Sequence, residues 1–120
     1  MQNIGIDIVE IDRIKRAVDR WGQSFLKRVY TEPELKLYSK HPSSLAARFS
    51  GKEAVIKALS AKGIGLKEIE ILSDNDGKPK VKLYGKGQHR AEEMNMLNLA
   101  ISLSHCKDYA VACAIVETKS

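Results

Sequence analysis

The chain has 120 residues and a formal net charge of +5, with 43% apolar and 29% charged residues. This length and balance indicate one globular domain, residues 1–120, and exclude a disordered chain. No apolar run approaches the roughly 18 residues that cross a bilayer, and no basic and apolar leader opens the sequence, so we expect a cytoplasmic protein without membrane contact. The positive charge favours a nucleic acid, an acidic protein or an anionic small molecule as partner, without choosing among them.

The first half of the sequence predicts one strand followed by helices. Isoleucines alternate with other residues from Ile4 to Val9, as in a β-strand, and apolar residues recur at helical spacing from Ile11 to Trp21. Thr31-Glu32-Pro33-Glu34 is typical of a helix start, because Thr31 can cap the helix and Glu34 stands where a capping box requires it. The predicted elements, in chain order, are a strand over 4–9 and helices over 11–21, 24–29, 31–39 and 44–60.

The second half of the sequence predicts strands, with one helix among them. Asp74-Asn75-Asp76-Gly77 contains residues that tolerate positive φ and separates two alternating segments, which indicates a β-hairpin. The predicted elements are strands over 69–72 and 79–84, a helix over 87–96, and strands over 99–103 and 109–116. Mixed strands with segregated helices indicate an α+β domain.

The predicted helix over 44–60 carries charges where an apolar surface is expected. Its large apolar residues share one face and its alanines lie roughly opposite, where a neighbouring backbone can approach; they are Leu45, Phe49, Ile56 and Leu59, and Ala47, Ala54 and Ala58. Lys52 falls near the middle of the apolar face, with Glu53 and Lys57 one turn apart at its edge. Charges are rarely buried without a partner, metal or ligand. Either Glu53 and Lys57 form an ordinary surface pair, or these charges belong to a site.

Asp7 raises the same question, because a carboxylate within an apolar strand costs free energy unless it is compensated. A local cap, or a salt bridge to Arg13 or a lysine, would compensate it. So would a role as ligand for Mg²⁺, which commonly takes one or two protein carboxylates and binds water and substrate phosphates besides. Asp7 and Glu53 would then be the metal ligands. The cations available for the phosphates are Arg48, Lys52 and Lys57.

Three motifs follow one another along the chain. They are Gly5-Ile6-Asp7-Ile8-Val9-Glu10, the run Arg48–Leu59 (RFSGKEAVIKAL), and Leu103-Ser104-His105 with the later Tyr109-Ala110-Val111-Ala112. Together they closely resemble the bacterial holo-acyl-carrier-protein synthases, the small class of 4′-phosphopantetheinyl transferases, over essentially the whole chain. The middle run is the most specific. Its Ser50-Gly51 pair differs from the alanine-rich version of many members.

The resemblance implies a fold, an activity and an assembly. The fold is the 4′-phosphopantetheinyl transferase fold, a small antiparallel-rich sheet packed with one long helix and shorter helices. The activity is Mg²⁺-dependent transfer of 4′-phosphopantetheine from coenzyme A to a serine of apo acyl carrier protein. This reaction releases adenosine 3′,5′-bisphosphate and supports fatty acid biosynthesis. Members are typically homotrimers with active sites between subunits, so a homotrimer is expected.

The resemblance also implies roles for individual residues. Asp7 and Glu53 match the family's Mg²⁺ ligands, and with Lys57 they form the expected catalytic group. The expected coenzyme A contacts are Arg48, Lys52, Lys57, Lys78, Pro79 and His105. The proton of the serine could pass to a metal-bound water, Asp7, Glu10 or His105, and the sequence does not rank them. His105 could equally be a strand-end residue satisfied by backbone.

Arginines follow one face of the first predicted helix. Arg13, Arg16 and Arg20 recur at i, i+3 and i+7, and such a patch would speed encounter with an acidic carrier protein. From the spacing alone a solvated polar face is the simpler interpretation. The resemblance makes Arg13 the expected docking residue, and it extends more weakly to Arg16, Arg20 and Arg28.

Two other functions fit parts of the pattern. A small basic nucleic-acid-binding module fits the charge, but aromatic residues make up only 6% and no stacking cluster is visible, so no nucleic acid partner is expected. A Mg²⁺-dependent phosphohydrolase would use the same carboxylates to activate water. Its product, hydrolysed coenzyme A without a modified carrier protein, distinguishes it from a transferase.

Overall fold

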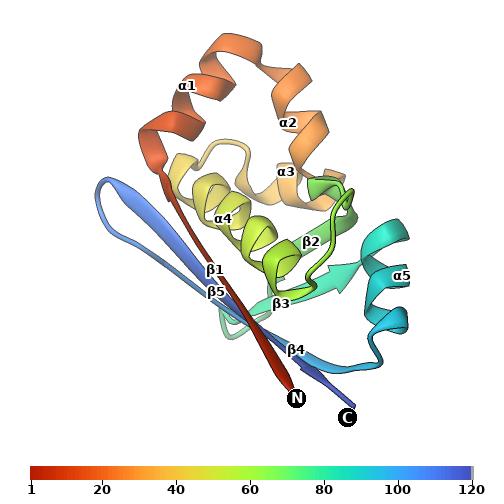
Figure 1. Cartoon of the computed structure of the whole chain (residues 1–120). Coiled ribbons are helices and arrows are strands. Elements are labelled where there is room, and N and C mark those ends of the chain that lie inside the picture. Colours follow the sequence, from red (N-terminus) through yellow and green to blue (C-terminus); the bar gives the residue numbers. More distant parts are fainter. Residues whose placement is uncertain (120) are drawn as a thin grey trace.

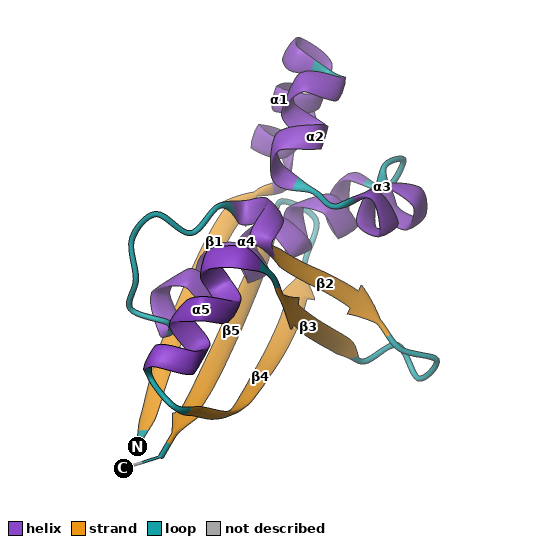
Figure 2. Cartoon of the chain, turned by 90° about the vertical axis from the view of Figure 1, so that its right-hand side faces the viewer, coloured by secondary structure: helices purple, strands orange, loops and turns teal. Residues whose placement is uncertain are grey.

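The structure, a computed structural model, describes residues 1–119. One long helix, α4 (Pro42–Ala58), crosses one face of a three-stranded sheet (Figure 1). The N-terminal helices gather at one end of α4, and a separate two-stranded hairpin lies beside it (Figure 2). This arrangement confirms the α+β class expected from the sequence.

Apart from the short 3₁₀ turn η1, the other elements match the predicted ones in type and order. They are β1 (Gln2–Glu10), α1 (Ile11–Trp21), α2 (Gln23–Val29), α3 (Glu32–Tyr38), η1 (Leu66–Glu68), β2 (Ile69–Ser73), β3 (Pro79–Leu83), α5 (Gly85–Glu93), β4 (Met96–His105) and β5 (Tyr109–Thr118). The short 3₁₀ turn η1 was not predicted. β4 and β5 are longer than expected because they pair with each other along nearly their whole length. Within residues 1–119, no helix is long and apolar enough to cross a membrane.

The larger sheet is antiparallel, with β1 at one edge and the order β1-β5-β4. Asp7 lies opposite Ala112 on β5, and Ala112 lies opposite Leu103 on β4. Because successive side chains of a strand point to opposite faces, Asp7 shares the α4 side with Gly5 and Val9. The apolar strand therefore directs its carboxylate toward the central helix.

The outer face of this sheet is apolar and exposed. Ile4, Ile6 and Ile8 are between 61% and 65% exposed, and Ile115 on β5, the partner of Ile4, adds to the same face. Contiguous exposed apolar surface of this kind is uncommon on monomeric proteins and marks a contact surface. We call these four isoleucines the outer sheet face.

Gly5 is the point at which β1 and α4 come closest. A Cβ built on Gly5 would overlap the carbonyl oxygen of Ala54 and would lie 2.8 Å from the backbone nitrogen of Ala58. Both alanines are fully buried, as expected for the small face of this helix. The Ser50 hydroxyl donates a 2.7 Å hydrogen bond to the Asp7 carbonyl oxygen. Small residues on both elements thus hold Asp7 beside α4.

Candidate functional site

β1 and α4 bring Asp7 and Lys57 together at the edge of the sheet. The Nζ atom of Lys57 lies 3.2 Å from Asp7 Oδ1 and donates a 2.9 Å hydrogen bond to the carbonyl oxygen of Ile6. The Lys57 side chain is 54% exposed, whereas that of Asp7 is 19% exposed. The lysine can therefore turn to an incoming anion, while the carboxylate stays largely sheltered.

Glu53 is the second carboxylate of this group. Burial raises the pKa of Glu53 most, and the negative charge of Asp7 raises it further, while Lys57 and Arg13 act in the opposite direction. These influences require Asp7, Lys57 and Arg13 to lie near Glu53. Two sheltered carboxylates repel each other, and a cation between them would relieve that repulsion.

Asp7 and Glu53 fit the needs of a hard divalent cation. Within residues 1–119, no group of three or more His, Cys, Asp or Glu side chains is arranged to hold a metal ion. A pair of carboxylates therefore suits only a cation that takes its other ligands from water and substrate. Mg²⁺ is such a cation, because it keeps several of its waters and binds proteins through one or two carboxylates plus substrate phosphates.

The ion pair of Lys57 decides between alternatives that the sequence left open. Lys57 pairs with Asp7, so the salt bridge from Asp7 to a lysine is present. In residues 1–119 Glu53 has no ion pair within 4.0 Å, and the simple surface pair of Glu53 with Lys57 is therefore wrong. One lysine compensates one carboxylate directly, which leaves the charge of Glu53 for another cation.

Lys52 does not belong to this group, and this corrects the expectation that it contacts coenzyme A phosphate. Its side chain is 0% exposed, and its ammonium donates to Glu34 Oε1 at 2.7 Å, to the Leu66 carbonyl oxygen at 3.1 Å and to the Ile69 carbonyl oxygen. An ammonium group has three donors, so none remains for a phosphate. The sequence identified a lysine at a core position but gave no sign of which carboxylate it meets.

Arg48 is buried on the side of α4 that faces the hairpin. Its guanidinium carbon lies 3.8 Å from the centre of the Tyr38 ring, and one terminal nitrogen donates a 2.8 Å hydrogen bond to the Ser73 hydroxyl. Its Nε atom is buried and has no hydrogen-bond partner among residues 1–119. An unpaired buried donor costs free energy, and an anion would relieve this cost. Contact between Arg48 and coenzyme A stays a prediction, and the orphaned donor is compatible with it.

The remaining expected coenzyme A contacts lie away from Asp7 within one chain. Lys78 ends the turn between β2 and β3 and Pro79 begins β3; the tip of this turn extends away from β1 (Figure 2). His105 ends β4 and is exposed; it lies two strands from Val9, on the α4 side of the sheet. Their roles stay predictions, and the single chain does not bring the hairpin turn to the carboxylates.

The predicted docking arginines are all exposed on the first two helices. Arg13 lies close enough to Glu53 to affect its pKa. It therefore links α1 to the cluster of Asp7, Glu53 and Lys57, which we call the carboxylate group. Arg16 pairs with Asp12 at 3.3 Å, and the Arg20 guanidinium carbon lies 5.0 Å from the centre of the Trp21 ring. Arg28 lies on α2. Arg13 is thus the docking candidate nearest the group.

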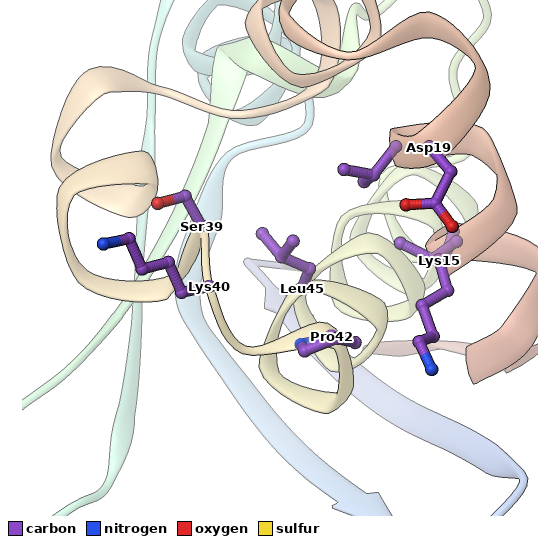
Figure 3. A pocket seen from close by; sticks show the side chains of 8 residues that line it. Lys15, Asp19, Ser39, Lys40, Pro42 and Leu45 are labelled. Carbon is purple, nitrogen blue, oxygen red and sulfur yellow. The ribbon is translucent and has the colours of Figure 1, made fainter.

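A small pocket of about 190 Å³ lies between α1 and the start of α4 (Figure 3). Its lining includes Ile14, Val18 and Leu45, with Lys15 and Lys40 among its charged residues. None of its lining residues is Asp7, Glu53 or Lys57. The pocket is therefore separate from the carboxylate group.

Comparison with known proteins identifies the family. Residues 3–114 match the model of the 4′-phosphopantetheinyl transferase superfamily. The chain is 48% identical over 114 residues to a holo-acyl-carrier-protein synthase of Dehalococcoides mccartyi, covering 94% of this chain and 96% of the relative. It is 50% identical over 120 residues to the synthase of Caldicellulosiruptor saccharolyticus, covering 96% and 95%. The Helicobacter pylori synthase, solved in complex with coenzyme A, superposes with a TM-score of 0.86 at 33% identity, over 95% of this chain and 99% of that one.

Proposed function

This chain belongs to the 4′-phosphopantetheinyl transferase superfamily, and we propose that it is a holo-acyl-carrier-protein synthase. It transfers the 4′-phosphopantetheine group from coenzyme A to a serine of apo acyl carrier protein and releases adenosine 3′,5′-bisphosphate. We assign this reaction to the cytoplasm and to fatty acid biosynthesis. The relatives named above and the coenzyme A complex of the Helicobacter pylori enzyme support the substrate.

The observation that supports a site for this reaction most directly is the meeting of Asp7 and Glu53 beside Lys57. These residues come from β1 and α4, and the raised pKa of Glu53 reflects the nearby charge of Asp7 after the effect of burial. Bound between the two carboxylates, Mg²⁺ would neutralise the diphosphate of coenzyme A as its bond breaks. Asp7 and Glu53 are accordingly the proposed metal ligands.

Lys57 is the proposed electrostatic catalyst. Its exposed ammonium can turn from Asp7 to a phosphate oxygen and offset the charge that develops on the leaving group. For the proton of the serine, Asp7 is better placed than Glu10 within one chain, because Glu10 alternates to the outer face of β1. His105 is exposed at the end of β4 and stays the alternative at a distance of two strands.

Arg13 is the proposed docking residue for the acidic carrier protein. It is exposed on α1 and acts on the pKa of Glu53, so a carrier protein bound to it would lie beside the carboxylate group. Arg16, already paired with Asp12, offers less free charge. Arg20 and Arg28 would extend the same positive surface.

We propose that the outer sheet face joins three copies of the chain. Ile4, Ile6 and Ile8 expose more than half of their surface, which favours burial against a neighbour. Such an assembly would also let the β2–β3 turn of one copy approach the carboxylates of another, which one chain alone does not do. Sedimentation of the wild type should give a trimer and Ile6→Lys a monomer; a monomeric wild type contradicts the assembly.

The test of the function is intact-mass analysis of an apo carrier protein after incubation with this protein, coenzyme A and Mg²⁺. We expect the carrier to become heavier by one phosphopantetheine, and we expect Asp7→Asn and Glu53→Gln each to abolish this gain. Glu92→Gln is the matched control, because it removes an exposed carboxylate on α5, away from the proposed metal ligands and docking arginines. This control should keep its activity.

Two results would contradict the proposal. Hydrolysed coenzyme A with an unmodified carrier would make the protein a phosphohydrolase. Full activity of both carboxylate variants would remove the metal assignment while leaving the transferase in place. Circular dichroism of each variant shows that the loss of activity does not come from unfolding.

A further inference from the structure

A buried ion pair between Lys52 and Glu34 lies next to the proposed metal ligand Glu53 but takes no part in the chemistry described above. Both side chains are 0% exposed, and Lys52 Nζ lies 2.7 Å from Glu34 Oε1. The ammonium also donates to the carbonyl oxygens of Leu66 in η1 and Ile69 at the start of β2. One side chain of α4 is thus attached to three other elements.

Glu34 extends these connections. Its Oε1 atom also accepts a 2.9 Å hydrogen bond from the Thr31 backbone nitrogen, which closes the cap of α3. Its Oε2 atom accepts a 2.8 Å hydrogen bond from the backbone nitrogen of Ile71 in the middle of β2. The Lys52–Glu34 pair therefore fixes α3, α4 and β2 relative to one another.

A second carboxylate continues the network toward β3. Glu70 accepts a 2.6 Å hydrogen bond from the Thr31 hydroxyl and a 3.2 Å hydrogen bond from the Tyr84 hydroxyl. Tyr84 directly follows β3 and directly precedes α5. The pair thus holds β2 directly at its start and in its middle, and Thr31 links Glu34 to Glu70, which in turn holds Tyr84 beyond the end of β3.

Stability alone does not explain charges at this place. A buried ion pair is often no more stabilising than apolar residues of the same volume, because both charges lose their hydration. Apolar packing has no preferred direction, whereas hydrogen bonds require a defined distance and angle. The five hydrogen bonds of the Lys52–Glu34 pair to one another and to backbone therefore define the rotation and the axial position of α4 against β2.

That position matters because α4 and β2 lead to different parts of the proposed site. Glu53 follows Lys52 on α4, and β2 leads through Ser73, the partner of Arg48, to the hairpin turn. A helix rises about 1.5 Å per residue, so a small slip of α4 would change the distance between these parts. In a symmetric oligomer the same spacing recurs in every copy, whether one chain or two complete the site.

We infer that Lys52 is a positioning residue, which with Glu34 sets the spacing between the carboxylates Asp7 and Glu53 on one flank of α4 and, on the other, the β2–β3 hairpin with its expected coenzyme A contacts. The inference rests on the proposed function. Lys52 touches neither substrate nor metal and acts through the geometry of α4 and β2. Its removal should therefore weaken coenzyme A binding and turnover in protein that remains folded.

The test is the double variant Lys52→Met with Glu34→Gln, which removes the pair without leaving a lone buried charge. We expect the kcat to fall about tenfold to a hundredfold, as a displacement near 1 Å does, with a higher KM for coenzyme A and an unchanged KM for the carrier protein. Calorimetry without metal should show coenzyme A binding weakened by a similar factor. Val116→Ala, which truncates a buried side chain of β5, is the control; it should lower Tm and leave kcat unchanged.

Glu34→Gln alone is a second variant; it keeps the volume of the side chain but leaves the Lys52 ammonium without its counter-charge, so hydrogen exchange is used to follow its geometry even where its stability falls. An amide nitrogen opposite the Ile71 backbone nitrogen cannot accept its hydrogen bond, so we expect faster hydrogen exchange at Ile71 and an intermediate loss of coenzyme A affinity. Folded variants with coenzyme A affinity and kcat within twofold of the wild type would overturn the inference. Failure of the proposed function would instead appear in the wild type, as a carrier protein that gains no mass.

Discussion

Helix α4 supplies the lysines of two lysine–carboxylate pairs that have the same chemistry and opposite surroundings, while the carboxylates come from α3 and β1. Lys52 and Glu34 meet at 2.7 Å with both side chains 0% exposed, whereas Lys57 and Asp7 meet at 3.2 Å with side chains 54% and 19% exposed. The sealed pair has every donor of its ammonium satisfied by protein. The open pair can exchange partners with a ligand. Burial, rather than residue type, separates a lysine that holds the fold from a lysine that can meet a substrate.

The largest expected effect comes from breaking the sealed pair on one side. Lys52→Met leaves the Glu34 carboxylate buried without its ion partner, and loss of one member of a buried pair costs about 3–5 kcal/mol. Denaturant unfolding, followed by circular dichroism, measures this loss. Recovery of most of the lost stability in the double variant with Glu34→Gln would show that the cost comes from the lone charge. A loss below about 1 kcal/mol in the single variant would mean that the pair is solvated.

Gly5→Ala tests the contact that holds the open pair in place. The new Cβ would meet the backbone of Ala54 and Ala58, which cannot move as a side-chain tip can, so we expect a loss of about 1–3 kcal/mol from overpacking. Because α4 must shift from β1, Asp7 and Glu53 should separate and transferase activity should fall with stability. Thermal unfolding and the carrier-protein mass assay together measure both effects.

Gly65→Ala is the matched control for this change. Gly65 has a φ of −75°, which any residue adopts, and a Cβ there would meet only the side chain of Glu68 at 3.3 Å. Its stability should change little. An equal loss in both variants would show that the effect comes from removing glycine and not from the approach of β1 to α4.

The same comparison shows what the sequence predicts and what it leaves open. The alternation around Asp7 and the alanine face of α4 follow from local periodicity, so the strand, the helix and the alanine face were predicted correctly, but the buried face of β1 was not predicted. Thr31 and Glu34 were predicted as a capping box, which they form. That Glu34 also meets Lys52 depends on how α3 packs against α4, and no local pattern encodes that packing. The sequence also did not predict that the apolar side of β1 is exposed, because alternation shows that a strand has two faces without showing which one a partner covers.

Lys57→Met tests the open pair and should separate activity from stability. An ion pair whose lysine is half exposed contributes about 0–1 kcal/mol, so the free energy of unfolding should change little. Turnover should fall strongly, because the phosphate loses its cation, whereas Lys52→Met should act through stability first. Steady-state kinetics and denaturant unfolding on the same protein preparation measure the change in kcat and the change in the free energy of unfolding separately. An unchanged kcat would exclude Lys57 from catalysis.

The smallest expected effect is a gain in stability from Glu53→Gln without metal. The pKa of Glu53 is raised in the folded chain by burial and by Asp7, so the folded state loses stability as the pH rises from the ordinary glutamate pKa of 4.5 through the raised value. The amide does not ionise and escapes this loss. Its stability should match the wild type well below pH 4.5 and exceed it at neutral pH by less than about 1 kcal/mol, because the side chain is only half-buried.

Added Mg²⁺ should make the wild type more stable than Glu53→Gln, the reverse of the order without metal. This reversal sharpens the distinction between the two flanks of α4. A ligand that binds only the folded state stabilises it, and the wild type alone keeps both carboxylates for the cation. Thermal unfolding at neutral pH with and without Mg²⁺ should therefore show the Glu53→Gln variant above the wild type without metal and below it with metal. The double variant Lys52→Met with Glu34→Gln keeps Asp7 and Glu53, so its stability should still respond to Mg²⁺. Equal responses of the wild type and Glu53→Gln to Mg²⁺ would contradict the role of Glu53 as a ligand.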